Sequence, residues 1–184
     1  RQVPVMINYN VGKKGFDKKM DEADLLLVKK IEESEILYEI PTDQIPKGDK
    51  TSDPFSVGIT HVHNYYTKRN LMVLAKLRNS AQILNQEHSL LFLEGIQTIS
   101  TSLVSKLTRY KYKKSGNSML SGTLYIASTT AEQNVIKVFI SKIKDIIIAK
   151  RQITSPSSII QTISSTNTKT NKNAIQYVFI DPPF

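Results

Sequence analysis

Apolar residues recur at the spacing of an α-helix in four parts of the chain. The clearest pattern covers residues 67–84, where leucines and alanines return every three or four positions. A second clear pattern, over residues 132–150, places valine, phenylalanine and isoleucine on one side and lysines elsewhere. Residues 20–33 predict a short helix, and residues 88–107 predict a less regular one. Each predicted helix has an apolar face to bury.

Polar residues mark where two of these helices begin. Asp21 stands where it can cap the short helix, and Thr67 stands at the corresponding position of the clearest one. Glu22 and Asp24 place acids in the first turn of the short helix, where the helix dipole favours negative charge.

Three shorter apolar runs, residues 122–127, 158–163 and 175–180, are typical of β-strands. Helices with one apolar face alternate with these runs, which predicts an α/β fold with helices packed on the faces of a sheet. Residues 38–58 contain several prolines and glycines and predict a long loop.

A single domain accounts for the whole chain of 184 residues. We divide it into a loop-rich N-terminal segment, residues 1–60, and an α/β part, residues 61–184. The chain has no cysteine, which excludes disulfides and thiolate metal sites. Its longest apolar runs are far shorter than a membrane span, and its N-terminus lacks a signal-peptide pattern. We therefore expect a cytoplasmic protein without a membrane partner.

The charge of the chain favours a polyanionic partner. Its 25 lysines and arginines exceed its 16 acids, for a net charge of +9. Each phosphate that a lysine or arginine neutralises releases counterions and adds affinity that does not depend on sequence. Nucleic acid is the partner that this surplus predicts.

Candidate chemistry lies at the end of the last predicted strand. In open α/β sheets, ligands bind beyond the carboxyl ends of the strands, and Asp181 follows residues 175–180 directly. Pro182 biases Asp181 towards an extended backbone, and Pro183 does the same to Pro182. Neither proline has an N–H group, so their carbonyls are available to a ligand.

The tetrapeptide Asp181–Phe184, DPPF, resembles the catalytic tetrapeptide of S-adenosylmethionine-dependent amino-methyltransferases, which act on the exocyclic amine of adenine or cytosine. Three more stretches, RQVPVMINYN, GITHVHNYYTKRNLMVLAKL and SGNSMLSGTLYIA, are similar to the later portion of bacterial DNA methylases, so the resemblance covers most of the chain. It implies a partial Rossmann-like methyltransferase sheet with helices on its faces. It also implies S-adenosylmethionine as cofactor and DNA as partner.

The resemblance gives each residue of the tetrapeptide a role. Asp181 and the carbonyl of Pro182 each accept a hydrogen bond from one N–H of the amine, which holds the nitrogen in line and stabilises its developing positive charge. Pro183 fixes their spacing, and Phe184 offers a face on which a base rotated out of the duplex can stack.

The chain departs from the family pattern in its glycines. Members of the family bind the cofactor with a glycine-rich turn after a first strand, and the seven glycines of this chain form no such cluster. The cofactor-binding residues are therefore not identified. We expect that part upstream in a longer methylase, of which this chain is a fragment that is inactive alone.

Basic residues mark two further candidate sites, both for DNA phosphates. Lys68 and Arg69 fall in the first turn of the clearest helix, where cations oppose the helix dipole and a phosphate or a cofactor carboxylate would relieve them; a solvated helix end is the other interpretation. A tract that mixes basic and aromatic residues suits phosphate contact and base stacking, or forms a solvated loop. The tract consists of Lys106, Arg109, Tyr110, Lys111, Tyr112, Lys113 and Lys114.

His61 and His63 would face the same side of a strand. A metal site needs a third ligand, and no clear carboxylate partner lies nearby in the sequence. We interpret both as hydrogen-bonded structural residues and expect no metal.

Alternatives remain at the level of function. Aspartate at position 181 favours adenine N6 over cytosine within the resemblance, where cytosine enzymes often carry serine. An RNA or protein-glutamine methyltransferase is the nearest rival, although those enzymes more often carry asparagine there. From another class, the chain could be a non-catalytic DNA-binding subunit. A restriction or defence-system partner is compatible with either.

Overall fold

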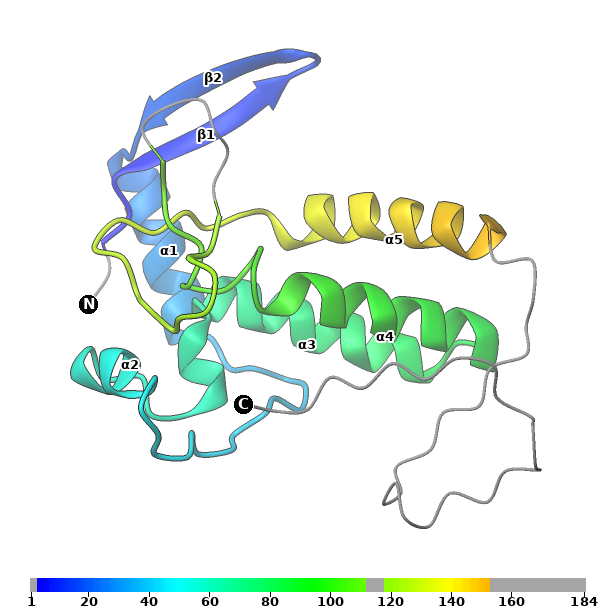
Figure 1. The fold of residues 1–184 in the computed structure, drawn as a ribbon. Helices are drawn as coiled ribbons and strands as arrows, with labels where there is room; N and C mark the ends of the chain where they lie inside the picture. Colours follow the sequence, from blue (N-terminus) through cyan, green and yellow to red (C-terminus); the bar gives the residue numbers. More distant parts are fainter. Residues whose placement is uncertain (1–2, 112–117, 153–184) are drawn as a thin grey trace. The chain divides into compact units, whose positions relative to one another are not determined.

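A computed structural model describes residues 3–111 and 118–152, which contain the elements labelled in Figure 1. These residues lie in the unit Arg1–Arg151, apart from the last residue of the final helix. The elements in chain order are β1 (Met6–Val11), β2 (Lys14–Lys19), α1 (Glu22–Glu33), α2 (Ser52–Ser56), a 3₁₀ turn η1 (Val62–Tyr65), α3 (Lys68–Gln82), α4 (Gln86–Ser100) and α5 (Val135–Gln152).

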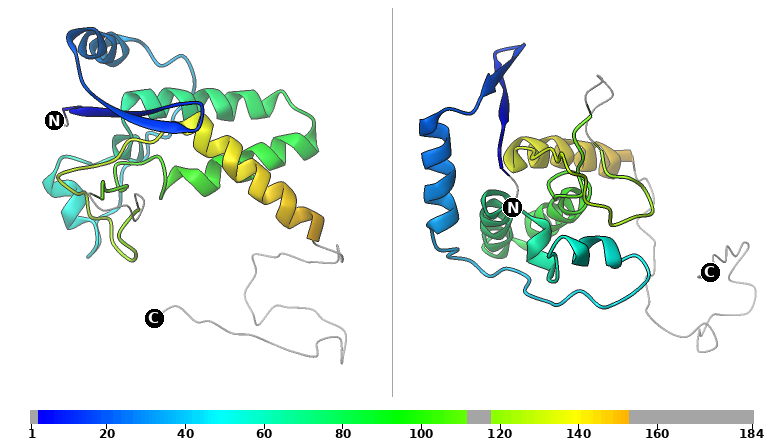
Figure 2. Two further views of the ribbon diagram at one scale, coloured as in Figure 1. Left: turned by 90° about the horizontal axis from the view of Figure 1, so that it is seen from above. Right: turned by 90° about the vertical axis from the view of Figure 1, so that its left-hand side faces the viewer.

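The hydrophobic core lies among the three long helices. Residues 83–85 connect α3 to α4, and α5 crosses the pair that they form (Figure 2). The buried core side chains come from all three helices and from the segment after α4. They are Leu74, Ile99, Val104, Val135 and Phe139.

A glycine lets α5 approach α4 closely. A Cβ atom at Gly95 would lie 2.6 Å from Cδ1 of Ile143 and 2.9 Å from Cε2 of Phe139. Phe139 also meets Phe92 of α4 edge to face, with the ring centroids 5.2 Å apart. The periodic apolar face predicted for residues 132–150 is thus the face that packs on α4.

The predicted helix starts are confirmed. The side chain of Asp21 accepts from the backbone N–H of Asp24, whose own side chain accepts from the N–H of Asp21, so α1 begins with a capping box. Thr67 caps α3 by accepting from the N–H of Asn70. Asn85 caps α4 in the same way.

The segment predicted to be loop-rich, residues 1–60, contains a β-hairpin. Strands β1 and β2 pair antiparallel, with Tyr9 opposite Phe16 and Val11 opposite Lys14. Gly12 opens the two-residue turn between them with a φ of 61°, a conformation that glycine adopts without steric cost. Residues 38–58 form the expected long connection, which is interrupted by α2 and closes through a bridge between Gln44 and His61.

The strand predicted at residues 122–127 is wrong. The segment has no regular secondary structure, no strand among the described residues pairs with its backbone, and Tyr125 within it is 45% exposed. The backbone partners nearby are isolated bridges from Arg109 to Ser118 and Thr130. Within the described residues the sheet is the antiparallel β1–β2 pair, so the described part is mixed α and β.

The strands predicted at residues 158–163 and 175–180 lie outside the described residues. The Rossmann-like sheet that the resemblance implies therefore stays a prediction. Within the described residues, every helix is too short or too polar to cross a membrane.

Candidate functional site

The catalytic tetrapeptide predicted at Asp181–Phe184 lies outside the described residues, and so do the last three residues of the basic tract, numbered 112–114. The other predicted DNA-contacting residues lie in two segments. Lys68 and Arg69 begin α3, whereas Lys106, Arg109, Tyr110 and Lys111 follow α4. Hydrogen bonds tie both segments to the loop that precedes α5.

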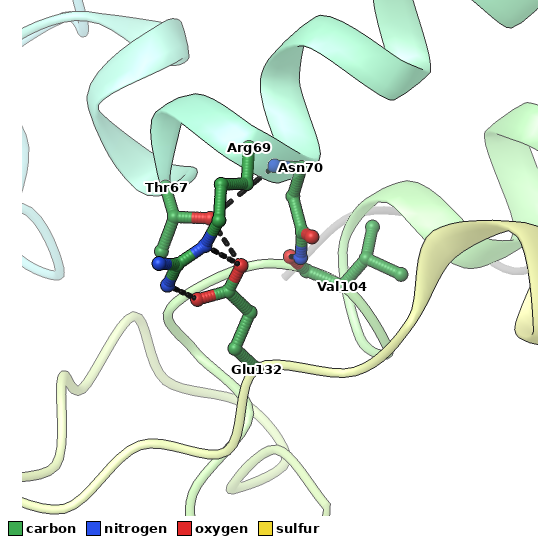
Figure 3. Close-up of polar contacts among 5 residues, drawn as sticks. All are labelled: Thr67, Arg69, Asn70, Val104 and Glu132. Atoms are coloured by element: carbon green, nitrogen blue, oxygen red, sulfur yellow. Dashed lines mark hydrogen bonds and ion pairs between the residues drawn. The ribbon is translucent and has the colours of Figure 1, made fainter. Parts of the chain in front are cut away.

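Glu132 is the centre of the contacts at the start of α3 (Figure 3). Its Oε1 accepts from Nε of Arg69 and from Oγ1 of Thr67, each at 2.9 Å, and its Oε2 forms an ion pair with Nη2 of Arg69. The guanidinium therefore holds the carboxylate with two parallel hydrogen bonds, a strong arrangement for this pair. A phosphate or a cofactor carboxylate was one expected partner for Arg69 at this helix start. In the structure the carboxylate of Glu132 is its partner.

The ion pair is shielded but not closed to solvent. The side chains of Arg69 and Glu132 are each 27% exposed. The hydrogen bond to Glu132 raises the pKa of Arg69, an effect that desolvation of the guanidinium opposes. Arg69 is therefore a cation that already has an internal partner.

Lys68 connects the same helix start to α1. Its Nζ donates to the backbone carbonyl of Glu32, in the last turn of α1, at 2.7 Å. Cations near the C-terminus of a helix satisfy carbonyls that lack an intrahelical partner. This contact accounts for Lys68 without a phosphate.

Asn70 and Lys106 bind the segment after α4 to η1 and α3. The buried Nδ2 of Asn70 donates to the carbonyl of Val104 at 2.9 Å (Figure 3). The Nζ of Lys106 donates to the carbonyl of Asn64 at 2.8 Å, and its backbone N–H donates to the carbonyl of Tyr65 at 2.7 Å. Burial lowers the pKa of Lys106, because the charged form loses hydration there.

Arg109, Tyr110 and Lys111 are half-buried. The backbone N–H of Arg109 donates to Ser118, and that of Tyr110 donates to Thr129. Two buried polar atoms, Nε of Arg109 and the hydroxyl oxygen of Tyr65, have no hydrogen-bond partner among the described residues. Backbone hydrogen bonds therefore fix residues 109 and 110, in the described part of the tract, to residues 118 and 129.

His61 and His63 lie at η1 and not on a regular strand. Thr60 Oγ1 lies 2.9 Å from Nδ1 of His61, and the carbonyl of Pro41 lies 3.3 Å from Nδ1 of His63. Their rings are tilted with centroids 5.6 Å apart. In the described ranges, no three His, Asp or Glu side chains converge on a common point as metal ligands would.

The contacts of Arg69 with Glu132 and of Asn70 with Val104 form a junction at the start of α3. The sequence predictions gave no role to two of its residues, Glu132 and Asn70. Glu132 opens the periodic segment 132–150, and an acid beside a helix start reads as a favourable helix-dipole charge. Asn70 falls on the buried side of α3, where a polar residue signals a specific hydrogen bond. A polar residue on the apolar side of the predicted helix was therefore the signal in the sequence for the Asn70 contact.

The chain matches no protein-family model, no curated protein sequence and no solved structure.

Proposed function

We propose that this chain forms part of a DNA amino-methyltransferase, which transfers the methyl group of S-adenosylmethionine to an exocyclic base amine, adenine N6. The observation that carries the proposal is the sequence Asp181-Pro182-Pro183-Phe184 directly after the apolar run 175–180. The net charge of +9 supports a nucleic-acid substrate.

The tetrapeptide suits a reaction at a weakly nucleophilic amine. The lone pair of an exocyclic amine is delocalised into the base, so a catalyst must favour its localised form. The carboxylate of Asp181 accepts a hydrogen bond from one N–H of the amine and the carbonyl of Pro182 accepts one from the other, which orients the lone pair and stabilises positive charge on nitrogen. Phe184 stacks on the base once it has left the duplex.

The cofactor supplies the methyl group in this scheme. No strand followed by a glycine-rich turn occurs in residues 3–111 and 118–152, so we assign no cofactor contact to them. We propose that the cofactor site is contributed by another part of a longer methylase. The basic tract then serves to hold the DNA.

A methyl-transfer assay on two proteins tests the proposal. The polypeptide encoded by the complete reading frame and the 184-residue chain are each incubated with tritiated S-adenosylmethionine and duplex DNA of mixed sequence. We expect label on adenine with the complete protein and none above a no-protein control with the chain.

The same assay repeated with RNA and with a glutamine peptide, together with separate measurements of DNA binding and cofactor binding, separates the alternatives. Label on RNA or on a glutamine peptide, with none on DNA, would move the activity to one of those substrates. DNA binding by the complete protein without cofactor binding would identify a non-catalytic subunit. Transfer by the 184-residue chain would show that the cofactor site lies within it.

A further inference from the structure

One face of the β1–β2 hairpin carries Tyr9, Val11 and Phe16 beside Lys14 and Lys18, and the aromatic and aliphatic side chains on it are open to solvent. Tyr9 and Phe16 stack across the two strands with ring centroids 5.6 Å apart and an interplanar angle of 22°. Val11 is 64% exposed, Tyr9 44% and Phe16 37%. Isolated two-stranded hairpins are marginally stable in water, so such a face is expected to have a partner.

The hairpin also carries positive charge that its own ladder leaves unbalanced. Lys14 pairs with Val11, Lys18 with Ile7 and Lys19 with Met6, so none of these lysines lies opposite an acid. The acid within the strands, Asp17, lies opposite Asn8 and accepts a hydrogen bond from it.

One of the hairpin lysines is used inside the chain. Nζ of Lys18 lies 2.7 Å from Asp21 and 2.8 Å from Asp24, so it ties the base of the hairpin to the capping box of α1. Lys13, Lys14 and Lys19 form no ion pair within the described residues, and Nζ of Lys14 lies 5.3 Å from the centre of the Phe16 ring. Their charge remains available to an external anion.

We infer that the β1–β2 hairpin binds duplex DNA as a ribbon in the major groove, with the Tyr9–Phe16 face against the groove. Lys14 on that face, Lys13 at the turn and Lys19 on the opposite face contact the phosphates on either side of the groove. The major groove admits a two-stranded ribbon, and apolar side chains contact thymine methyl groups there. The inference rests on the proposed function for the identity of the polyanion. The combination of clustered cations with exposed aromatic rings favours nucleic acid over a protein surface.

Salt dependence tests the lysines. Binding of the 184-residue chain to a fluorescent mixed-sequence duplex is measured by anisotropy over a range of salt concentrations. Replacing Lys13, Lys14 and Lys19 together with Ala should weaken binding and lower the slope of log K against log salt by about 2 to 3 units. A matched variant replaces the exposed helix residues Lys30, Lys137 and Lys144, which removes the same charge, and should change the slope by less than about one unit.

Fluorescence tests the aromatic face. The chain contains no tryptophan, so Phe16→Trp introduces a unique reporter that keeps an aromatic ring at this position. Its emission should be quenched by duplex DNA and recover at high salt. Ile83→Trp, at an 82% exposed position after α3, is the control that should respond little.

The inference is overturned if the unaltered chain does not bind duplex DNA, if the two lysine variants have equal slopes, or if DNA leaves the Phe16→Trp emission unchanged. The last two results together would show that the Tyr9–Phe16 face does not contact duplex DNA. If the hairpin binds DNA in these tests but the complete protein transfers no methyl group, this inference stands and the proposed chemistry is wrong. If the complete protein transfers methyl groups but the hairpin does not bind DNA, the proposed chemistry stands and this inference is wrong.

Discussion

Glu132 and Arg69 are joined by two hydrogen bonds although 63 positions separate them in the chain. The contact fixes the loop before α5 to the first turn of α3, next to the point where Asn70 holds the segment after α4. Three segments that the sequence separates widely therefore meet at the start of one helix. The junction positions the beginning of the basic tract.

A double-mutant cycle measures the coupling between these two side chains. The pair is bidentate and partly shielded from solvent. We therefore expect the free energies of urea unfolding of Arg69→Ala, Glu132→Ala and the double variant to give a coupling energy of about 1 kcal/mol. The exposed pair Lys142–Asp145 is the control, and its coupling should stay below about 0.5 kcal/mol. Equal couplings for the two pairs would contradict the structural role of the Glu132 contact.

Gly95 should resist substitution although it lies inside a helix. Alanine there gains about 1 kcal/mol of helix propensity, but its Cβ would overlap Phe139 and Ile143, and overpacking costs about 1 to 3 kcal/mol. We expect Gly95→Ala to lower the free energy of unfolding, and Gly95→Val to lower it further. Gly48→Ala, where nothing lies within 4 Å of the added atom, should change it by less than about 0.5 kcal/mol. A Gly95→Ala protein more stable than the parent would show that α4 and α5 do not pack as described.

The Nζ of Lys106 is bonded to the backbone carbonyl of Asn64, whereas the sequence analysis assigns Lys111, Lys113 and Lys114 to DNA phosphates. Replacing Lys111, Lys113 and Lys114 with Ala in the complete protein should flatten the salt dependence of DNA binding by up to about three units of slope. Lys106→Met should lower the melting temperature and leave the slope unchanged, since its Nζ is bonded to the carbonyl of Asn64. A changed slope for Lys106→Met, with none for the triple variant, would reverse these assignments.

The helices were predictable because their signals are local. Asp21 and Thr67 stand directly before periodic apolar runs, and both cap the helices expected of them. The strand predicted at residues 122–127 was wrong, since an apolar run becomes a strand only beside a partner that the sequence does not reveal.

The hairpin had a readable signal that our sequence analysis missed. Ile7, Tyr9 and Val11 alternate with asparagines, and a turn that begins with Gly12 follows them. The junction at the start of α3 had no such signal for its pairing. Nothing in a linear pattern matches Arg69 with Glu132, because the contact arises from how α3 and the loop before α5 meet.

The central claim concerns Asp181, whose carboxylate we propose to act mainly in the transition state by accepting a hydrogen bond from an amine that is becoming positive. Asp181→Asn keeps an acceptor oxygen and loses the charge, so it should be impaired less than Asp181→Ala. Phe184→Ala should weaken capture of the flipped base by about 1 to 3 kcal/mol.

The most direct test is single-turnover methyl transfer by the longer protein proposed above at saturating cofactor and DNA, with folding of each variant checked by circular dichroism. We predict that Asp181→Ala lowers the rate about a hundredfold or more, the scale expected when one preorganised electrostatic partner is lost, while cofactor binding is largely kept. A folded Asp181→Ala enzyme that reacts at the parent's rate would show that the tetrapeptide is a turn without catalytic function, and would contradict the proposed mechanism.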